Sequence, residues 1–213
     1  MNLVFDFGAV LVDWQPAQLL AEHFPDLTAT PQAAQHLARS LFGHADWHAF
    51  DRGQITLELV VRRTAQRLAL PPRQLRGLVA GIGERLRPLQ DSVAVLAELD
   101  ERRRLRGDVR LYFLSNMPVP YARTLEQKHT FLQWFDGGIF SGDVQHIKPE
   151  PAIYQLLQAR YALAPAQTLM IDDLKGNVDA ACALGWEGIQ FVSAQQLRRS
   201  LGNLLHQPDQ GNP

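Results

Sequence analysis

Residues 2–12 read NLVFDFGAVLV, and this stretch decides the fold. The apolar run Leu3–Phe5 leads into Asp6 and then into a turn that contains Gly8. The run is too continuous for a strand with one face in water, so it predicts a strand buried on both faces of a parallel sheet. Ligands of such sheets bind at the carboxyl ends of the strands, which is where Asp6 stands. Taken alone, Asp6 is equally well explained as a residue that caps the turn.

Further apolar runs repeat this pattern, at Val109–Leu114, Gly138–Phe140, Leu169–Ile171 and Gly188–Val192. Helical segments separate most of these runs, and Pro151 can occupy the first turn of one of them. Another helix is predicted from Asn177 to Leu184, with Gly185 placed to end it. The residues of this helix that should face inward are Val178, Ala181 and Cys182. Alternating strands and helices predict an α/β fold with a doubly wound parallel sheet, as in Rossmann-type proteins.

The interval 15–87 breaks this alternation, because it has helical periodicity, contains no convincing strand and is far longer than a normal crossover. We predict an inserted helical cap over 15–87 and an α/β core formed by 1–14 and 88–213. The predicted cap helices are Pro16–His23, Pro31–Phe42, Thr56–Leu68 and Pro72–Arg85. The chain becomes polar towards its end, so about 201–213 is predicted to be a disordered tail.

Composition and charge limit the possible functions. With 213 residues, 46% of them hydrophobic, the chain can bury one main core and a small inserted domain. A formal charge of −1 gives no overall positive field for nucleic acid or a membrane surface, and neither is expected as a partner. The arginine-rich segment Glu98–Arg110 is interpreted as a solvated helix end. No apolar stretch reaches the roughly 20 residues of a membrane helix.

Two further expectations concern the compartment and the cysteine. The sequence begins with a strand-like run rather than a basic leader or signal peptide, which predicts a cytoplasmic protein. Cys182 is the single cysteine, which excludes an internal disulfide and a multi-cysteine zinc site, and we interpret it as a packing residue. Either a monomer or a homodimer is compatible with the sequence.

Polar side chains follow the other predicted strands. Ser115 and Asn116 offer short neutral donors to an oxyanion at the end of the second strand. Lys148 stands in the sequence IKPEP, where two prolines stiffen its approach. Asp172 and Asp173 follow a buried strand, and adjacent carboxylates repel each other unless a cation or donors compensate them. A turn, a solvated lysine and an exposed acidic pair would explain each of these features singly.

The combination of these groups with Asp6 at one sheet edge is more specific than any single member. A phosphate monoester carries two negative charges, so a carboxylate can approach its phosphorus only where a divalent cation and fixed donors neutralise them. Mg²⁺ prefers oxygen ligands and retains waters. The available ligands are Asp6, Asp172 or Asp173, and a backbone carbonyl of the first turn.

These segments resemble a known family. The sequences FDFGAVL at 5–11, SN at 115–116, IKPEP at 147–151 and IDD at 171–173 are similar to the ordered motifs of the haloacid dehalogenase (HAD) superfamily. Asn177, Ala181 and Gly185 follow the last motif as they do in that superfamily. The cap position and the sequence HAFDRG at 48–53 resemble in particular the α-D-glucose-1-phosphate phosphatase-like branch.

The resemblance implies a Mg²⁺-dependent phosphatase that works through an aspartyl-phosphate on Asp6. The implied substrate is a small phosphorylated metabolite, for example a sugar phosphate. The resemblance makes Asp6 both nucleophile and metal ligand, and the carbonyl of Gly8 a second ligand. Asp172 is the first choice for the third ligand, whereas Asp173 either ligates or holds a metal-bound water. The residues that would grip the transferring phosphoryl group are Ser115, Asn116 and Lys148.

One position departs from the usual pattern. Most phosphatases of the superfamily place a second aspartate two residues after the nucleophile, as general acid, whereas this chain has Gly8. Losing such a group typically costs about a hundredfold to ten-thousandfold in rate. The glucose-1-phosphate phosphatase branch also carries glycine there, which suggests substrates with acidic leaving groups, such as anomeric sugar phosphates. Candidate replacements are Asp13, His44 and His48, although fold or cap-surface roles explain each of them more simply.

Two other functions compete with phosphatase activity. A 2-haloacid dehalogenase would use the same nucleophile on carbon without a metal, but the acidic pair would repel its carboxylate substrate. A non-catalytic binding protein of this fold could use Trp14, Trp47 and Trp134 as a partner surface. Keeping Asp6 and Lys148 favours an enzyme.

Overall fold

The computed structural model describes residues 1–205. Its strands are β1 (Asn2–Phe5), β2 (Arg110–Ser115), β3 (Gly137–Phe140), β4 (Thr168–Asp172) and β5 (Glu187–Gln190). Its α-helices are α1 (Pro16–His23), α2 (Pro31–Phe42), α3 (Ala45–Asp51), α4 (Leu57–Leu68), α5 (Pro72–Arg85), α6 (Gln90–Arg106), α7 (Val119–Lys128), α8 (Pro151–Tyr161), α9 (Lys175–Ala183) and α10 (Ala194–Leu205). Short 3₁₀ turns are η1 (Pro25–Leu27), η2 (Thr130–Trp134), η3 (Ser141–Asp143) and η4 (Pro165–Gln167).

The strands form one five-stranded parallel sheet in the order β3-β2-β1-β4-β5. Phe5 of β1 pairs with Phe113 of β2 on one side and with Ile171 of β4 on the other. The chain builds one half of the sheet and then returns past β1 to build the other half. This is the predicted doubly wound α/β fold, and it puts the carboxyl ends of β1, β2 and β4 side by side.

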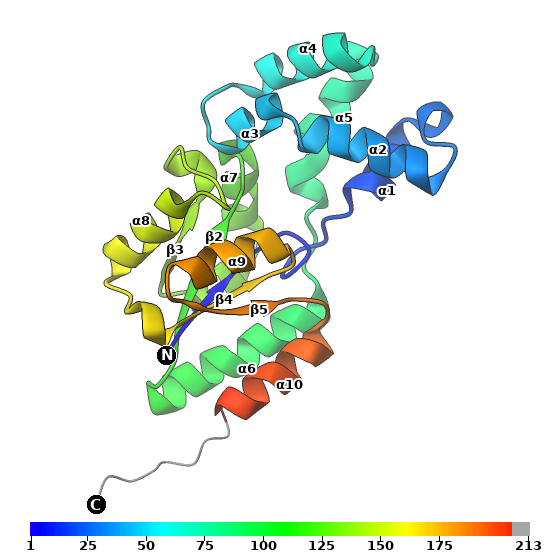
Figure 1. The fold of residues 1–213 in the computed structure, drawn as a ribbon. Coiled ribbons are helices and arrows are strands. Elements are labelled where there is room, and N and C mark those ends of the chain that lie inside the picture. Colours follow the sequence, from blue (N-terminus) through cyan, green and yellow to red (C-terminus); the bar gives the residue numbers. More distant parts are fainter. Residues whose placement is uncertain (206–213) are drawn as a thin grey trace, which may run out of the picture.

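Side chains of the central strand alternate between two hydrophobic cores, one on each face of the sheet. Leu3 and Phe5 enter the core that contains residues of α6, α7 and α10. Val4 enters the core that contains residues of α8 and α9. Helices therefore cover both faces of β1, as expected for a continuous apolar strand. Figure 1 shows α6 and α10 next to each other below the sheet.

The prediction that Gly188–Val192 forms a buried strand is wrong in its bounds and in its burial. β5 lies at the edge of the sheet, and most of its residues are exposed. It ends at Gln190, and Val192 is 77% exposed because the chain leaves the sheet there to begin α10. Only one long side of an edge strand is paired, so its burial is weaker than that of β1.

The predicted orientation of Cys182 is wrong, because this residue is exposed. Val178 and Ala181 are buried as predicted, and α9 also buries Asn177. The Cys182 thiol lies beside Gly188 of β5, which has no side chain to cover it. Gly185 follows α9 with a φ of +84°, and the helix ends there as predicted.

The predicted disordered tail begins too early in the sequence. α10 extends through residues 201–205, and both Leu197 and Leu201 are buried in the core that includes α6. Their four-residue spacing places them on one face of the helix, which orders this segment by burial. The remaining part of the predicted tail, residues 206–213, lies outside the described residues.

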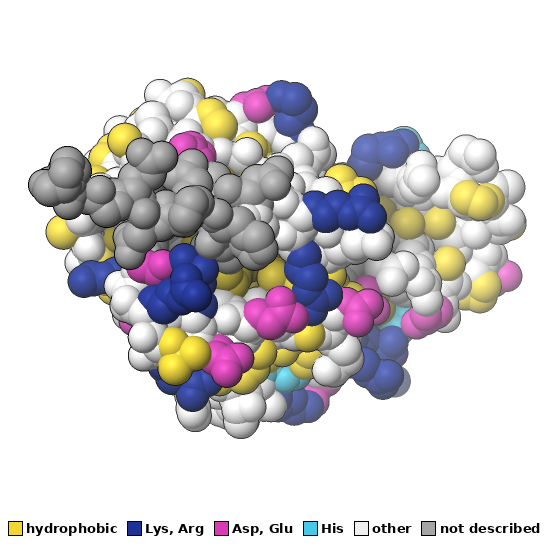
Figure 2. Space-filling view, turned by 90° about the horizontal axis from the view of Figure 1, so that it is seen from below, with side chains coloured by type: hydrophobic (Ala, Val, Ile, Leu, Met, Phe, Trp, Pro, Cys, Tyr) yellow, Lys and Arg dark blue, Asp and Glu magenta, His cyan; other side chains and the backbone are white. Residues whose placement is uncertain are grey.

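The face seen from below carries interspersed basic and acidic side chains (Figure 2). Arg198 of α10 pairs with Glu98 of α6 at 2.7 Å. Arg103 near the end of α6 pairs with Asp100 at 2.7 Å and with Asp136 at 2.8 Å. These pairs support the interpretation of the arginine-rich segment as an ordinary helix end. No helix within residues 1–205 is long and apolar enough to cross a membrane.

Helices α1–α5, called the cap helices below, lie together on one side of the structure (Figure 1). α1, α2 and α5 have the predicted bounds, each with proline in its first turn. α4 begins at Leu57 because the Thr56 side chain caps it from outside. α3 was not predicted, since it has only seven residues and begins after a histidine cap, His44. The division into cap and core domains remains a prediction.

Two chain segments connect the cap helices with the sheet, and they hydrogen-bond to each other. Asp13 N donates to Arg87 O at 2.8 Å, and Leu89 N donates to Leu11 O at 2.9 Å. Val12 and Pro88 form an antiparallel bridge between these bonds. The two connections therefore form a short paired ribbon.

Gly53, just after α3, is expected to tolerate no side chain. Its φ is +70°, and a Cβ would collide with the carbonyl oxygen of Gly142. We expect Gly53→Ala to lower the free energy of unfolding by about 3 kcal/mol, through strain and steric conflict. Gly107→Ala is the control, because Gly107 has a φ of +68° in open space and should cost about 1 kcal/mol. Urea denaturation measures both, and equal losses would contradict a role for the contact with Gly142.

Candidate active site

The carboxyl ends of three neighbouring strands bring Asp6, Ser115 and Asp172 to one place. Asp6 follows β1, and its N–H donates to Ile171 O of β4 at 2.9 Å. Ser115 is the last residue of β2, and Asp172 is the last residue of β4. All of these side chains are buried. Since parallel strands end at the same sheet edge, residues far apart in sequence meet here as predicted.

Lys148 is buried between two of the carboxylates. Its Nζ lies 2.9 Å from Asp6 Oδ1 and 2.6 Å from Asp172 Oδ2. The Lys148–Pro149 peptide bond is cis. Burial alone would lower the pKa of Lys148, but Asp6 and Asp172 outweigh burial and hold this pKa above its ordinary value. The lysine therefore remains charged and compensates its acidic neighbours.

Asp6, Asp172 and Asp173 form a cluster of carboxylates. Each offers an oxygen, and these oxygens lie within 4.8 Å of one another. Burial raises the pKa of Asp6 to about 7; Asp172 acts in the same direction, whereas Lys148 opposes it. Burial and the charge of Asp172 also raise the pKa of Asp173. Crowded carboxylates of this kind suit a divalent cation with oxygen ligands, so the residues fit Mg²⁺.

Two asparagines fix the loops around this cluster. Asn116 Nδ2 donates to Lys148 O at 2.9 Å, and Asn116 Oδ1 accepts from Lys148 N at 2.7 Å. Asn177 Nδ2 donates to both carboxylate oxygens of Asp172, at 2.9 and 3.0 Å. Leu174 N also donates to Asp172 Oδ1 at 2.9 Å. Both polar atoms of the Asn116 amide are therefore hydrogen-bonded to the backbone of Lys148, and both carboxylate oxygens of Asp172 accept hydrogen bonds.

A cavity of about 390 Å³ joins this polar cluster to the cap helices. Its polar lining residues include Asp6, Ser115, Asn116, Lys148 and Asp173, together with His48 and Asp51 of α3. Its apolar and aromatic lining residues include Trp14, Phe42, Trp47, Ile82, Leu86, Met117 and Tyr121. Edge-to-face contacts link the rings in the order Trp14, Phe42, Trp47, Phe50 and Tyr121. A connected set of aromatic rings thus lines the same cavity as Asp6.

The two candidate histidines have different positions. His48 lines the cavity, and burial together with the charge of Arg52 lowers the pKa of its imidazole. His44 caps α3, where its Nδ1 accepts from Asp46 N at 3.1 Å. His44 therefore has a structural role, whereas His48 remains a candidate.

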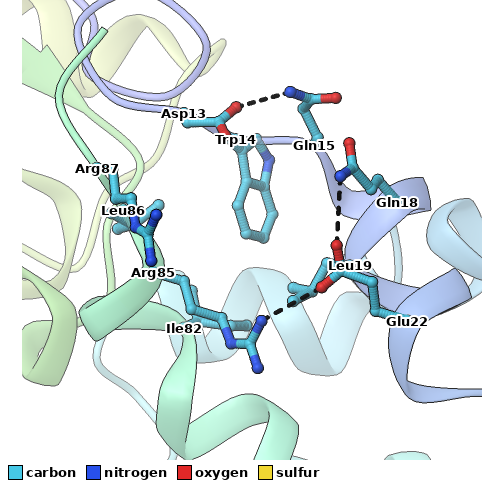
Figure 3. Close-up of a pocket in the computed structure, with 10 residues that line it drawn as sticks. All are labelled: Asp13, Trp14, Gln15, Gln18, Leu19, Glu22, Ile82, Arg85, Leu86 and Arg87. Carbon is cyan, nitrogen blue, oxygen red and sulfur yellow. Dashed lines mark hydrogen bonds and ion pairs between the residues drawn. The ribbon is translucent and has the colours of Figure 1, made fainter.

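Asp13 lies in a neighbouring cavity of about 300 Å³ (Figure 3). Its carboxylate accepts a hydrogen bond from Gln15 Nε2 at 2.9 Å. Trp14 projects between the two sides of this cavity and also lines the larger one. Asp13 and Asp6 therefore line two different cavities, and Trp14 lines both.

Asp51 lines the larger cavity and was missed by the sequence reasoning. It is the last residue of α3 and is 8% exposed. Asp51 follows Trp47 by four residues, so a helix over this segment would place both on one face. That spacing was the available signal, but it is informative only once the helix is known.

The haloacid dehalogenase-like hydrolase family model matches residues 3–185. This range contains every strand end that contributes to the site. The chain therefore belongs to the haloacid dehalogenase-like hydrolases and is a hydrolase, as the motifs predicted. Membership of the glucose-1-phosphate phosphatase-like branch remains a prediction.

Individual relatives include the sesquiterpene phosphatase astK of Aspergillus oryzae, which is 25% identical over 204 residues, 93% of this chain and 95% of its own. Among solved structures, the chain is similar to HAD family enzyme bt-2542 of Bacteroides thetaiotaomicron in complex with magnesium and inorganic phosphate. The TM-score is 0.67 and the sequence identity is 19%, and the match covers 88% of this chain and 92% of that enzyme. The L-2-haloacid dehalogenase of Xanthobacter autotrophicus has a TM-score of 0.62 and 20% identity over 97% and 84%. These structural similarities confirm the fold.

Proposed function

We propose that this hydrolase is a Mg²⁺-dependent phosphatase that cleaves small phosphate monoesters through an aspartyl-phosphate on Asp6. The main supporting observation is that Lys148 Nζ lies 2.9 Å from Asp6 Oδ1, beside two further carboxylates. A fixed cation next to a buried carboxylate lowers the repulsion between that carboxylate and a phosphoryl group. Similarity to a sesquiterpene phosphatase over 93% of the chain also favours phosphate esters.

Asp6, Asp173 and the carbonyl of Gly8 would hold the Mg²⁺ ion. Asp173 lines the cavity, whereas both oxygens of Asp172 are already engaged by neighbouring donors. We therefore prefer Asp173 as the direct ligand and assign Asp172 to holding Lys148, which reverses the order that the motif alone implied. When bound, Mg²⁺ would neutralise charge on the phosphoryl oxygens.

We assign the remaining roles from the chemistry of each side chain and from its neighbours. A carboxylate oxygen of Asp6 attacks phosphorus, and the bond from phosphorus to the ester oxygen breaks. Lys148 and Ser115 would hold phosphoryl oxygens, while Asn116, bonded to the Lys148 backbone, positions the lysine. Water then attacks the phosphorus of the aspartyl-phosphate, which releases inorganic phosphate and restores Asp6.

The cavity also favours a particular kind of leaving group. Its wall of tryptophan, phenylalanine and leucine side chains can bury an apolar alcohol, and each buried CH₂ contributes about 0.8 kcal/mol. A sugar would place hydroxyls among these apolar side chains, where His48 and Asp51 could pair with only some of them, and each unpaired hydroxyl would cost about 1–3 kcal/mol. We therefore propose an alcohol with a large apolar part, in keeping with the similarity to a sesquiterpene phosphatase. The earlier sugar-phosphate hypothesis becomes the alternative.

A substrate panel tests this proposal, with p-nitrophenyl, farnesyl, glucose 1- and glucose 6-phosphate assayed in Mg²⁺ or in EDTA. We expect EDTA to lower every rate by about a hundredfold or more, because a bound metal supplies several kcal/mol of transition-state stabilisation. We expect kcat/KM for farnesyl phosphate to exceed that for either sugar phosphate by about tenfold or more. A sugar phosphate as the best substrate would contradict the assignment of the apolar wall.

The same assay separates the competing functions. Chloride release from 2-chloropropionate in EDTA would indicate a haloacid dehalogenase. Tight Mg²⁺-dependent binding of phosphate, without hydrolysis of p-nitrophenyl phosphate, would indicate a binding protein. Either result would replace the phosphatase proposal.

A further inference from the structure

The cavity contains an acidic side chain that the proposed function does not yet use. Gly8 cannot supply the proton that an alcohol leaving group needs. Among the described residues that line the cavity, the acidic ones are Asp6, Asp51 and Asp173. Asp6 is the proposed nucleophile and Asp173 belongs to the carboxylate cluster, which leaves Asp51.

The surroundings of Asp51 favour the protonated carboxylic acid. The side chain is 8% exposed, and burial raises the pKa of Asp51 well above its ordinary value even though Arg52 opposes this effect. The Trp47 side chain, one helical turn earlier, acts in the same direction as Arg52 and lowers the pKa of Asp51, but burial outweighs both. The raised pKa of Asp51 favours the protonated carboxyl group, which is the form that a general acid needs.

The core holds Asp51 in place through its backbone and its neighbours. Ser141 Oγ donates to Asp51 O at 2.6 Å and accepts from Met117 N at 2.8 Å. Met117 directly follows the loop of Ser115 and Asn116. One serine thus connects the end of α3 to the proposed phosphate-binding loop.

The next two residues add further contacts with the core. Arg52 pairs with Glu150, two residues after Lys148, and Gly53 packs against the backbone of Gly142. The segment 51–53 is therefore fastened to both loops that carry proposed phosphate ligands. A general acid needs this kind of fixed position relative to the reacting phosphorus.

Other titratable side chains of the cavity are less suitable as the acid. The lowered pKa of His48 leaves its imidazole neutral near pH 7, so it has no extra proton to give. The Tyr121 hydroxyl donates to Val79 O at 2.7 Å, and burial raises its pKa further above its ordinary value.

We propose that Asp51, carried by the cap helices, is the general acid–base of the phosphatase, in place of the side chain that Gly8 lacks. The inference rests on the proposed phosphatase function. In the first step Asp6 forms its bond to phosphorus, the bond to the ester oxygen breaks, and the Asp51 proton passes to that oxygen to give the free alcohol. In the second step the Asp51 carboxylate accepts a proton from the attacking water, and phosphate leaves Asp6.

The test compares Asp51→Asn with the parent enzyme on two esters. Farnesyl phosphate has a basic leaving oxygen that needs a proton, whereas p-nitrophenolate leaves without one. We expect kcat for farnesyl phosphate to fall by about a hundredfold or more. With p-nitrophenyl phosphate we expect a burst of one p-nitrophenolate per enzyme at the parental rate, followed by slow turnover, because the second step still lacks its base.

Asp46→Asn provides the matched control on the same helix. Asp46 forms an ion pair with Arg63 at 3.0 Å and does not line the cavity. This variant should therefore keep the parental rates on both esters. Thermal unfolding verifies that each variant is folded. Equal slowing of the first step for both esters, or no slowing with farnesyl phosphate, would overturn the role of Asp51. Absence of phosphatase activity in the parent enzyme would instead overturn the proposed function itself.

Discussion

Asp6→Asn is expected to abolish turnover of p-nitrophenyl phosphate, with a loss of about ten-thousandfold or more. Asparagine keeps the size of the side chain but removes the charge that attacks phosphorus. The fold should survive, because burial and Asp172 already disfavour the charged form of Asp6. Lys148 also keeps Asp172 as a partner at 2.6 Å. Steady-state rates and thermal unfolding measure the two effects separately.

Asp13→Asn is the matched control for this experiment, because it makes the same substitution at a residue that does not line the cavity of Asp6. It should retain the parental rate. After rapid acid quenching during turnover, the parent protein should carry one added phosphoryl group by mass spectrometry, and the Asp6 variant should carry none. A phosphorylated Asp6→Asn protein, or an active one, would contradict the assignment of the nucleophile.

Lys148→Met is expected to lower the free energy of unfolding by about 3 kcal/mol or more, as well as to remove activity. Methionine has a similar length, but it leaves Asp6 and Asp172 buried without the charge that compensates them. Removing one partner of a buried ion pair is costly because the other charge stays in a poorly solvated place. Urea denaturation of the purified protein measures this loss.

Lys175→Met is the control for Lys148, because Lys175 forms an exposed pair with Asp179 and should cost under about 1 kcal/mol. A second variant tests the mechanism of the loss. Adding Asp172→Asn to Lys148→Met removes one uncompensated carboxylate and should restore part of the stability. No recovery, or equal losses for the two lysines, would show that the buried charges are not the cause.

The convergence of the site could be predicted from the sequence for a topological reason. Asp6, Ser115 and Asp172 each follow or end a buried strand, and parallel strands expose their carboxyl ends at one edge. Lys148 was harder to place, since its loop follows no strand directly, yet its prolines and the motif indicated it correctly. The part of each residue in catalysis stays a proposal.

The finer roles depend on hydrogen bonds that no spacing reveals. The sequence presents Asn116 as a phosphate donor, but its amide is bonded to both backbone groups of Lys148. The sequence also presents Asp172 and Asp173 as near equivalents. In the structure both oxygens of Asp172 accept hydrogen bonds, whereas Asp173 lines the cavity. Tertiary contacts decide these differences.

The cap shows where local signals succeed and fail. Proline at the start of α1, α2 and α5 marks these helices in the sequence because its fixed φ suits a first turn. α3 has no such residue and spans barely two turns, so periodicity could not reveal it. Asp51 could not be predicted for the same reason, because its place beside the cavity depends on α3.

The paired ribbon between the cap helices and the sheet has a mechanical consequence. Two unconnected segments would let the cap helices tilt and twist independently of the sheet. Here backbone hydrogen bonds join the segments, from Asp13 to Arg87 and from Leu89 to Leu11, so we expect the two segments to bend together as one hinge. We expect a cap on a single hinge to swing along one path and to close to the same position each time. The hydrogen bond from Ser141 Oγ to Asp51 O ties the end of α3 to the core at a second place, so we expect any movement of the cap helices to break it.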